Sequence, residues 1–343
     1  MKTIIHIADF YASEIKGGGE LVDQIVVDSL VERGYKVTRI KSKQVTEKLI
    51  KDNAEKTFIV SNFTMLSSAC INLLQTCDYV IYEHDHKYIS NRDPSPYKDY
   101  KVPSDKLVNL DFYRNAKAVL AQSKLHAQVI SKNIRSANVV NLGCSLWSNE
   151  EFDILEKYIH STKNGSMAVL ESSNSIKGTY EAKRYCEQNN IEYTTIGSPN
   201  YEEFIIQLSQ CDGLVFFSQV LETFCRLAVE ARVLNCKLKT NNNLGCVSEE
   251  WFSKYKGLEL LQFLKSQKSV VIDKVIEALE SDKRQEVVEA PITVILNAYR
   301  RPYNLKMQID AIRKQTTRPT QIWLWINEHE DNIGFNFKEL DLD

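Results

Sequence analysis

The sequence lacks long apolar segments, close cysteine pairs and any excess of charge of one sign. Its longest apolar runs have the length of a strand, such as residues 213–217, and none approaches the roughly 20 apolar residues of a membrane span. Lysine and arginine number 43 against 45 aspartates and glutamates, which argues against a broadly basic nucleic-acid binder. The first residues lack the apolar core and cleavage site of a secretory signal. We therefore expect a cytoplasmic protein with no transmembrane segment and no nucleic-acid partner.

Proline and glycine are scarce as well, with seven and 12 residues, so long disordered tracts are not expected. The eight cysteines include no C-x-x-C pair, whereas a structural zinc site needs closely spaced ligands. We interpret them as reduced, mostly buried thiols. Of the six histidines, only His84 and His86 are close together, and no third metal ligand stands near them. We therefore expect neither a metal site nor a cofactor.

Apolar periodicity predicts two successive α/β series. The first contains short apolar strands such as 3–8 and 118–121, and the second begins with strands at 167–170 and 213–217. Strands that alternate with helices form parallel sheets with helices on both faces. Two such halves predict a cleft between them, with ligands at the carboxyl ends of the strands.

Changes in composition predict the domain boundaries. A polar stretch around one amphipathic helix, at 143–166, is expected to be the hinge, and a break occurs at 289–291. We expect one Rossmann-like domain at 1–150, a second at 151–290, and a separate segment at 291–343. The second domain is predicted to end in two helices, near 255–265 and 270–281.

A glycine-rich loop is the first candidate for binding. Gly17, Gly18 and Gly19 precede a helical pattern, and the free amides at a helix N-terminus attract anions. The spacing matches neither G-x-G-x-x-G nor a P-loop. The loop is either a flexible turn or a place where the backbone must approach a substrate closely.

A lysine beside a glycine forms the second candidate. Lys177 and Gly178 follow the predicted strand at 167–170 and precede a predicted helix. A lysine at this position can neutralise a phosphate as a point charge. The alternative is an ordinary exposed lysine.

Two glutamates separated by seven residues form the third candidate. Glu222 precedes a predicted helix, and Glu230 lies inside it among apolar residues. A buried carboxylate needs a partner, and a ribose diol can donate two hydrogen bonds to one. The amides of Thr223, Phe224 and Cys225 would point toward a phosphate. The alternative is a surface glutamate on an amphipathic helix.

These elements together resemble a family of retaining glycosyltransferases with the GT-B fold, which includes glycogen, sucrose and lipopolysaccharide glycosyltransferases. The segment from Glu222 to Glu230 is similar to the family's Glu-x7-Glu motif. Residues 17–20, followed by a helix and 33–38, resemble its amino-terminal glycine loop unit. Residues 241–249 resemble a later loop of the family.

The resemblance covers roughly residues 1–285 and implies two Rossmann-like domains that face each other across a cleft. It implies a hexosyltransferase-type enzyme that moves a sugar from a nucleotide sugar to a glycan, lipid-linked or other acceptor, with retention and without a metal. By this resemblance, Lys177 would contact the diphosphate and Glu230 would hold the ribose. Glu222 would face the donor sugar, and His84 or His86 would lie near the reaction centre.

The sequence departs from the family's pattern at two positions. Ser172 stands five positions before Lys177, where the family usually has an arginine, and Thr223 replaces the usual glycine after Glu222. Arg226 is the candidate to replace the missing charge. These departures favour an alternative, a catalytically weak or inactive module that binds nucleotide sugars or glycans on the same fold. An epimerase or phosphorylase on this scaffold is a further alternative.

The segment 291–343 resembles the beginning of a different fold, that of inverting GT-A glycosyltransferases. Its sequence predicts a strand at 292–296, a helix at 304–314 and a strand at 321–326. We expect an incomplete domain there, and the alternative is an extension that packs on the GT-B unit.

Overall fold

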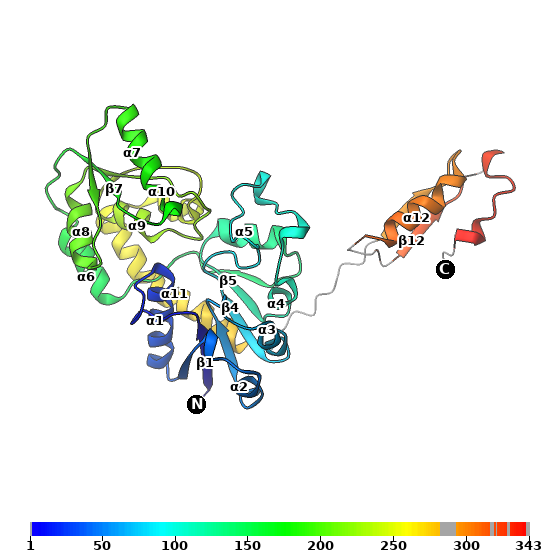
Figure 1. Cartoon of the computed structure of the whole chain (residues 1–343), viewed down its shortest axis with the longest axis horizontal. Coiled ribbons are helices and arrows are strands. Elements are labelled where there is room, and N and C mark those ends of the chain that lie inside the picture. The colour runs from blue at the N-terminus through cyan, green and yellow to red at the C-terminus, as the bar shows by residue number, and fades with distance from the viewer. Residues whose placement is uncertain (1, 282–292, 316–318, 320, 328–329, 341–343) are drawn as a thin grey trace. The chain divides into compact units, whose positions relative to one another are not determined.

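The computed structural model describes residues 2–281, 293–315, 319, 321–327 and 330–340 (Figure 1). The chain divides into two compact units, residues 1–284 and 285–343. Among the described residues, no helix is both long enough and apolar enough to cross a membrane.

The first unit contains two parallel sheets. One has six strands in the order β2-β1-β3-β4-β5-β6, and the other has four in the order β10-β9-β7-β8. All strand pairs in both sheets are parallel. We call the six-stranded sheet with its helices the N-lobe and the four-stranded sheet with its helices the C-lobe. The predicted α/β class with two parallel-sheet halves is confirmed.

The N-lobe alternates strands with helices along the chain. Its strands are β1 (Thr3–Ala8), β2 (Lys36–Lys41), β3 (Thr57–Val60), β4 (Asp78–Tyr82), β5 (Ala118–Ala121) and β6 (Val139–Asn141). Its helices are α1 (Gly18–Glu32), α2 (Glu47–Lys51), α3 (Ser68–Leu74), α4 (Leu110–Arg114) and α5 (Lys124–Asn133). Short 3-10 turns lie at η1 (Ser42–Gln44), η2 (Lys98–Tyr100) and η3 (Ser104–Lys106).

The central strands of the N-lobe are apolar because both faces of the sheet are covered. Successive side chains of a strand point to opposite faces. Accordingly, Ile4 and Leu120 belong to one buried cluster, whereas Ile5 and Val119 belong to another. This arrangement explains why the strands read as continuous apolar runs in the sequence.

The C-lobe repeats the alternation around a smaller sheet. Its strands are β7 (Met167–Leu170), β8 (Tyr193–Ile196), β9 (Gly213–Phe216) and β10 (Lys237–Thr240). Its helices are α6 (Asn149–Tyr158), α7 (Thr179–Gln188), α8 (Tyr201–Gln210), α9 (Arg226–Val233) and α10 (Glu250–Lys254), with 3-10 turns η4 (Ser175–Lys177) and η5 (Gly245–Ser248).

One long helix, α11 (Gly257–Glu280), follows the C-lobe and contacts both lobes. The prediction of two helices at 255–265 and 270–281 was wrong. The buried residues form two groups, Leu260–Leu264 and Val271–Leu279, and the polar residues 266–269 between them contain no proline or glycine, so the helix continues through them. Figure 1 shows α11, in yellow, passing from the C-lobe to the N-lobe.

The end of α11 is tied to the N-lobe by polar contacts. Asp273 pairs with Arg33 at 2.9 Å, and the carbonyl of Leu279 accepts a hydrogen bond from Lys117 Nζ at 2.9 Å. The last helix of the segment 151–290 therefore packs on α1 and β4 of the N-lobe as well as on α6 and α9 of the C-lobe.

The second unit contains a strand, a helix and a strand. These are β11 (Thr293–Asn297), α12 (Leu305–Arg313) and β12 (Gln321–Trp325), with β11 and β12 parallel. Turns η6 (Pro302–Asn304), η7 (Glu330–Asn332) and η8 (Phe337–Leu340) complete it. The predicted break at 289–291 and the first residue of the predicted strand at 292 lie outside the described residues. The resemblance of this unit to a GT-A domain stays a prediction.

We predict that Gly178→Ala destabilises the protein much more than Gly165→Ala. Both glycines have positive φ angles, 65° and 86°, which cost about 1–2 kcal/mol for other residues. A Cβ at Gly178 would also lie 1.9 Å from the carbonyl oxygen of Phe217, whereas nothing lies within 4 Å of one at Gly165. Urea denaturation of both variants measures the difference. Equal losses of unfolding free energy would contradict the steric role of Gly178.

Candidate functional site

A cleft of about 780 Å³ is lined by residues of both lobes. His84 follows β4 and Gln122 follows β5, while Lys177 comes after β7 and Glu222 after β9. All four therefore lie beyond the carboxyl ends of parallel strands, where ligands bind in open α/β sheets. The cleft brings together most of the residues that the sequence analysis selected: Gly18, Gly19, His84, Lys177, Glu222, Thr223, Phe224, Cys225 and Glu230.

The three glycines divide between a cap and a helix. Gly17 is the N-cap of α1, and Gly18 and Gly19 are its first two residues and line the cleft. A Cβ at Gly19 would lie 3.3 Å from Cγ of His84. The absence of a side chain at Gly19 therefore lets the His84 imidazole approach the helix closely.

Lys177 and Glu222 form an ion pair inside the cleft. The Lys177 Nζ atom lies 2.7 Å from Oε1 of Glu222. Burial alone would lower the pKa of Lys177, but the neighbouring carboxylate outweighs this effect and raises it. The residue expected to contact the diphosphate and the residue expected to face the sugar therefore neutralise each other. Gly178 follows directly, in the left-handed conformation, as the N-cap of α7.

The segment before α9 is held by both lobes. Thr223 donates its hydroxyl to the backbone carbonyl of His84 at 2.8 Å, and Phe224 is buried beside the rings of Trp147 and Trp251. Cys225 is the N-cap of α9 and has a φ of 80°. A non-glycine residue in this conformation is strained, which is frequent where a backbone is shaped for binding.

Glu230 is buried within α9 and has protein partners. Its Oε1 atom accepts hydrogen bonds from Trp147 Nε1 at 2.9 Å and from the Tyr201 hydroxyl at 3.2 Å. Arg226, one turn earlier, lies 3.6 Å from the same oxygen. Burial raises the pKa of Glu230 above its usual value even though Arg226 opposes the shift. None of these contacts uses Oε2, and the ribose contact stays a prediction.

Arg226 has a larger role than the sequence analysis gave it. Its guanidinium pairs with Glu151 of α6, approaches Glu230, and lies 5.1 Å from the centre of the Trp147 ring. It therefore balances two buried carboxylates rather than standing free for a phosphate. The Arg226-to-Glu230 spacing of four residues on a helix was the available sequence signal.

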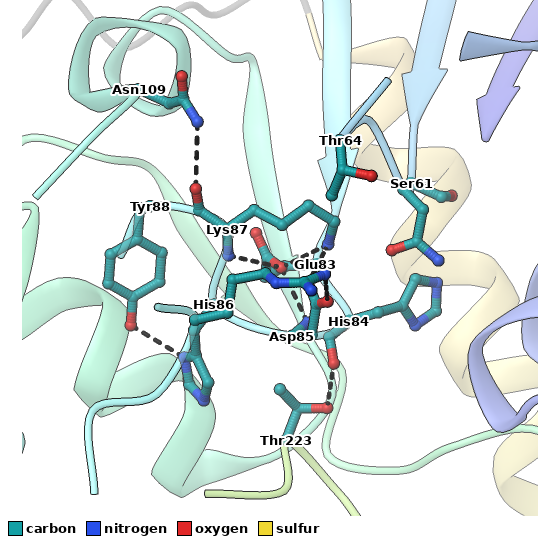
Figure 2. A network of polar contacts seen from close by, with 12 residues as sticks. Ser61, Thr64, Glu83, His84, Asp85, His86, Lys87, Tyr88, Asn109 and Thr223 are labelled. Atoms are coloured by element: carbon teal, nitrogen blue, oxygen red, sulfur yellow. Dashed lines mark hydrogen bonds and ion pairs between the residues drawn. The ribbon is translucent and has the colours of Figure 1, made fainter. Parts of the chain in front are cut away.

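The structure separates the two candidate histidines. His84 lines the cleft, and its Nε2 atom lies 2.9 Å from Oδ1 of Asp23 on α1. His86 is fully buried, with its Nδ1 atom 3.0 Å from the Tyr88 hydroxyl, and is not among the residues that line the cleft. Figure 2 shows the two imidazoles pointing away from each other. Only His84 is placed to meet a ligand in the cleft.

A buried ion pair shapes the loop that carries both histidines. Glu83 accepts hydrogen bonds from Lys87 Nζ at 2.9 Å and from the Asp85 amide at 3.0 Å (Figure 2). It also accepts one from the Tyr113 hydroxyl. Burial alone would raise the pKa of Glu83, but Lys87 and these donors lower it to about 2. Because the carboxylate bonds the backbone of its own loop, it fixes the direction in which His84 leaves β4.

All eight cysteines are buried, as predicted. Within the part of the chain that the structure describes, no three His, Cys, Asp or Glu side chains are grouped so that they could hold a metal ion.

No protein-family model matches the chain, and no curated protein matches it. Among solved structures, the chain is similar to a UDP-forming α,α-trehalose-phosphate synthase from Burkholderia vietnamiensis. The identity is 9%, the TM-score is 0.53, and the match covers 81% of this chain and 98% of that one. The chain therefore has the GT-B fold of this glycosyltransferase.

Two further structures are similar at lower TM-scores. Anabaena HepE in complex with UDP and glucose is 13% identical, with a TM-score of 0.49 and coverage of 82% and 100% of the two chains. An α-glucosyltransferase in complex with UDP and a 13-mer DNA is 10% identical, with a TM-score of 0.45 and coverage of 81% and 94%. The expected lack of a nucleic-acid partner stays a prediction.

We predict that Arg226→Met costs about 3 kcal/mol of unfolding free energy at pH 7, because it leaves the buried carboxylates of Glu151 and Glu230 unpaired. The loss should shrink toward pH 5, since unpaired buried carboxylates take up protons. Arg232→Met on the same helix is the control, because Arg232 bonds the carbonyls of Ser253 and Tyr255. Chemical denaturation at both pH values measures the difference, and an equal loss at pH 5 and 7 would refute the pairing.

We predict that the neutral His86 makes stability fall as the pH drops from about 6.5 to about 4. Burial lowers the pKa of His86 to about 4, so the unfolded chain binds a proton in this window that the folded chain does not. The contribution is on the order of 3 kcal/mol over the window. His86→Asn, which tolerates the positive φ of 59°, should flatten the pH dependence of unfolding. An unchanged slope would contradict the assignment.

Proposed function

We propose that this chain is a glycosyltransferase that moves a sugar from a nucleotide sugar to an acceptor. The observation that carries the proposal is the cleft itself. It places Lys177, Glu222 and Glu230 of the C-lobe opposite His84 and Gly19 of the N-lobe. A donor bound on the C-lobe would present its sugar to an acceptor on the N-lobe.

The donor's diphosphate would lie between Lys177 and the start of α9. In this position the ammonium group and the amides that precede the helix would stabilise the charge that develops on the leaving nucleoside diphosphate. The Lys177–Glu222 pair would then open, and Glu222 would turn to the hydroxyls of the donor sugar. This exchange is available because both side chains are already in the cleft.

The ribose would lie against Glu230. Trp147, Tyr201 and Arg226 all contact Oε1, so the carboxylate is held in place while Oε2 is outside these contacts. A carboxylate oxygen can accept from a diol hydroxyl. Uridine is the base to test first, because the structurally similar trehalose-phosphate synthase is UDP-forming.

The finer features of the proposal follow the sequence resemblance. They are hexosyl transfer, retention at the anomeric carbon, catalysis without a metal or cofactor, and a cytoplasmic location. The acceptor would be a glycan, a lipid-linked sugar or another hydroxyl compound.

Replacing Glu230 by Gln should weaken UDP binding at least tenfold in calorimetry, since a hydrogen bond to a charged group contributes about 1.5–3 kcal/mol. The amide keeps the shape of the side chain. Glu187→Gln on the exposed side of α7 is the control and should bind UDP as the unmodified protein does. Unchanged affinity of Glu230→Gln would remove the ribose assignment.

A binding module without transferase activity is the second candidate. It is favoured by the ion pair that occupies Lys177 and by the serine at position 172. Incubation with a panel of UDP-, GDP- and ADP-sugars distinguishes the two functions. Release of nucleoside diphosphate supports the transferase, whereas binding without release supports the module.

A further inference from the structure

A chain of buried hydrogen bonds lies beneath the cleft and ends at His84. Asp23, on α1, is 1% exposed, and its Oδ1 atom lies 2.8 Å from the Ser61 hydroxyl and 2.9 Å from His84 Nε2. His6 on β1 continues the chain, with its Nε2 atom 3.0 Å from the Ser61 hydroxyl oxygen. Asp23 was not among the residues selected from the sequence.

The direction of these bonds follows from what each group can donate. Ser61 donates its one proton to Asp23, so its oxygen accepts from His6 Nε2. The ionised Asp23 carboxylate can only accept, so the Nε2 atom of His84 must carry a hydrogen. Burial alone would raise the pKa of Asp23, but the two imidazoles hold it well below its usual value. The carboxylate of Asp23 is therefore the acceptor of the hydrogen bonds from both Ser61 and His84.

The opposite nitrogen of His84 is then an acceptor. Its Nδ1 atom lies 3.1 Å from Nε2 of Gln122. The same Gln122 nitrogen is 3.3 Å from the carbonyl oxygen of Glu83, which only accepts and so fixes the orientation of the amide. It is also 3.3 Å from the Thr223 hydroxyl oxygen, which donates its own proton to the His84 carbonyl.

This arrangement leaves one acceptor in excess. The Gln122 amide has two hydrogens and three acceptors within reach, on Glu83, Thr223 and His84. Of the three acceptors, His84 is also held by Asp23, which bonds the other nitrogen of its ring. Its Nδ1 atom can therefore exchange Gln122 for a ligand hydroxyl without leaving a donor unpaired. The charged groups that interact with the ring are Asp23 and Glu20 of α1.

We propose that Asp23 is a positioning residue that holds His84 in the Nε2–H tautomer, so that Nδ1 accepts a hydrogen bond from a hydroxyl of the sugar substrate. The inference rests on the proposed function for the identity of the ligand. Asp23 does not line the cleft, and it acts only through His84. Ser61 and His84 bond the same oxygen of Asp23, so Asp23→Asn can keep both hydrogen bonds through its amide oxygen. Asp23→Leu removes the acceptor, so the hydrogen of His84 is no longer confined to Nε2.

Nitrogen-15 NMR of the full chain tests the tautomer directly, with His84→Gln to assign the signal. We expect Nε2 of His84 to carry the hydrogen in the unmodified protein, and both ring nitrogens to carry it in part in Asp23→Leu. Ser61→Ala is the matched control, since it removes one donor to Asp23 but keeps the carboxylate, and it should leave the tautomer unchanged. A hydrogen on Nδ1 in the unmodified protein would overturn the proposal.

Kinetics test the consequence with the nucleotide sugar that the unmodified protein consumes fastest. Asp23→Leu should lower kcat about 100-fold, with the KM for the nucleotide sugar within twofold, while Ser61→Ala lowers kcat less than about threefold. An unchanged kcat in Asp23→Leu would overturn the proposal. If Asp23→Leu does not fold, addition of that nucleotide sugar to the unmodified protein should shift the Nδ1 resonance of His84, and an unmoved resonance counts against the proposal.

The two proposals fail in different ways. Lack of consumption of every nucleotide sugar would refute the transferase and with it the substrate part of this inference. The tautomer of His84 is measured without any ligand, so it reports on Asp23 independently.

Discussion

The hydrogen bonds of Thr223 to the N-lobe are the constraint on which the cleft depends. Its hydroxyl is donated to the His84 carbonyl, and its own carbonyl accepts from the Ser123 hydroxyl at 2.7 Å. Ser123 is also the N-cap of α5, so the same side chain caps the start of a helix in one lobe and bonds a loop of the other. These short polar contacts set the distance between His84 and the Lys177–Glu222 pair. A glycine at position 223 could not make the hydroxyl contact.

Charge is balanced within each part of the cleft before any ligand is considered. Lys177 is paired with Glu222, and Arg226 is shared between Glu151 and Glu230. On the N-lobe side, Asp23 accepts hydrogen bonds from Ser61 and His84, and His6 Nε2 lies 3.7 Å from the same oxygen. Because buried charges are costly unless paired, each of these sets fixes its side chains in one geometry. The cleft is thus preorganised by ion pairs. A ligand that binds Lys177 or Glu222 must replace one partner of their ion pair.

Most of the fold could be predicted from the sequence, and the failures have physical causes. Strands such as β4 and β5 are apolar on both faces, so they could be recognised without tertiary information. Strand β10 was missed because its lysines alternate with half-buried residues at the edge of the sheet. Helix α11 was divided in two because its polar middle was taken for a break, although polar residues without proline or glycine do not interrupt a helix.

The sequence by itself determined most of the order of the strands and helices, the positions of the two glutamates, and the resemblance that selected Lys177, Glu222 and Glu230. These are properties of local periodicity and spacing, which a single chain segment contains. The tertiary structure alone showed that His84 and not His86 lines the cleft, paired Arg226 with two carboxylates, and brought Asp23 beneath the cleft. The reason is that such contacts join residues as much as 75 positions apart in the sequence. An aspartate on an amphipathic helix is predicted to be exposed to solvent until its partners elsewhere in the fold are known.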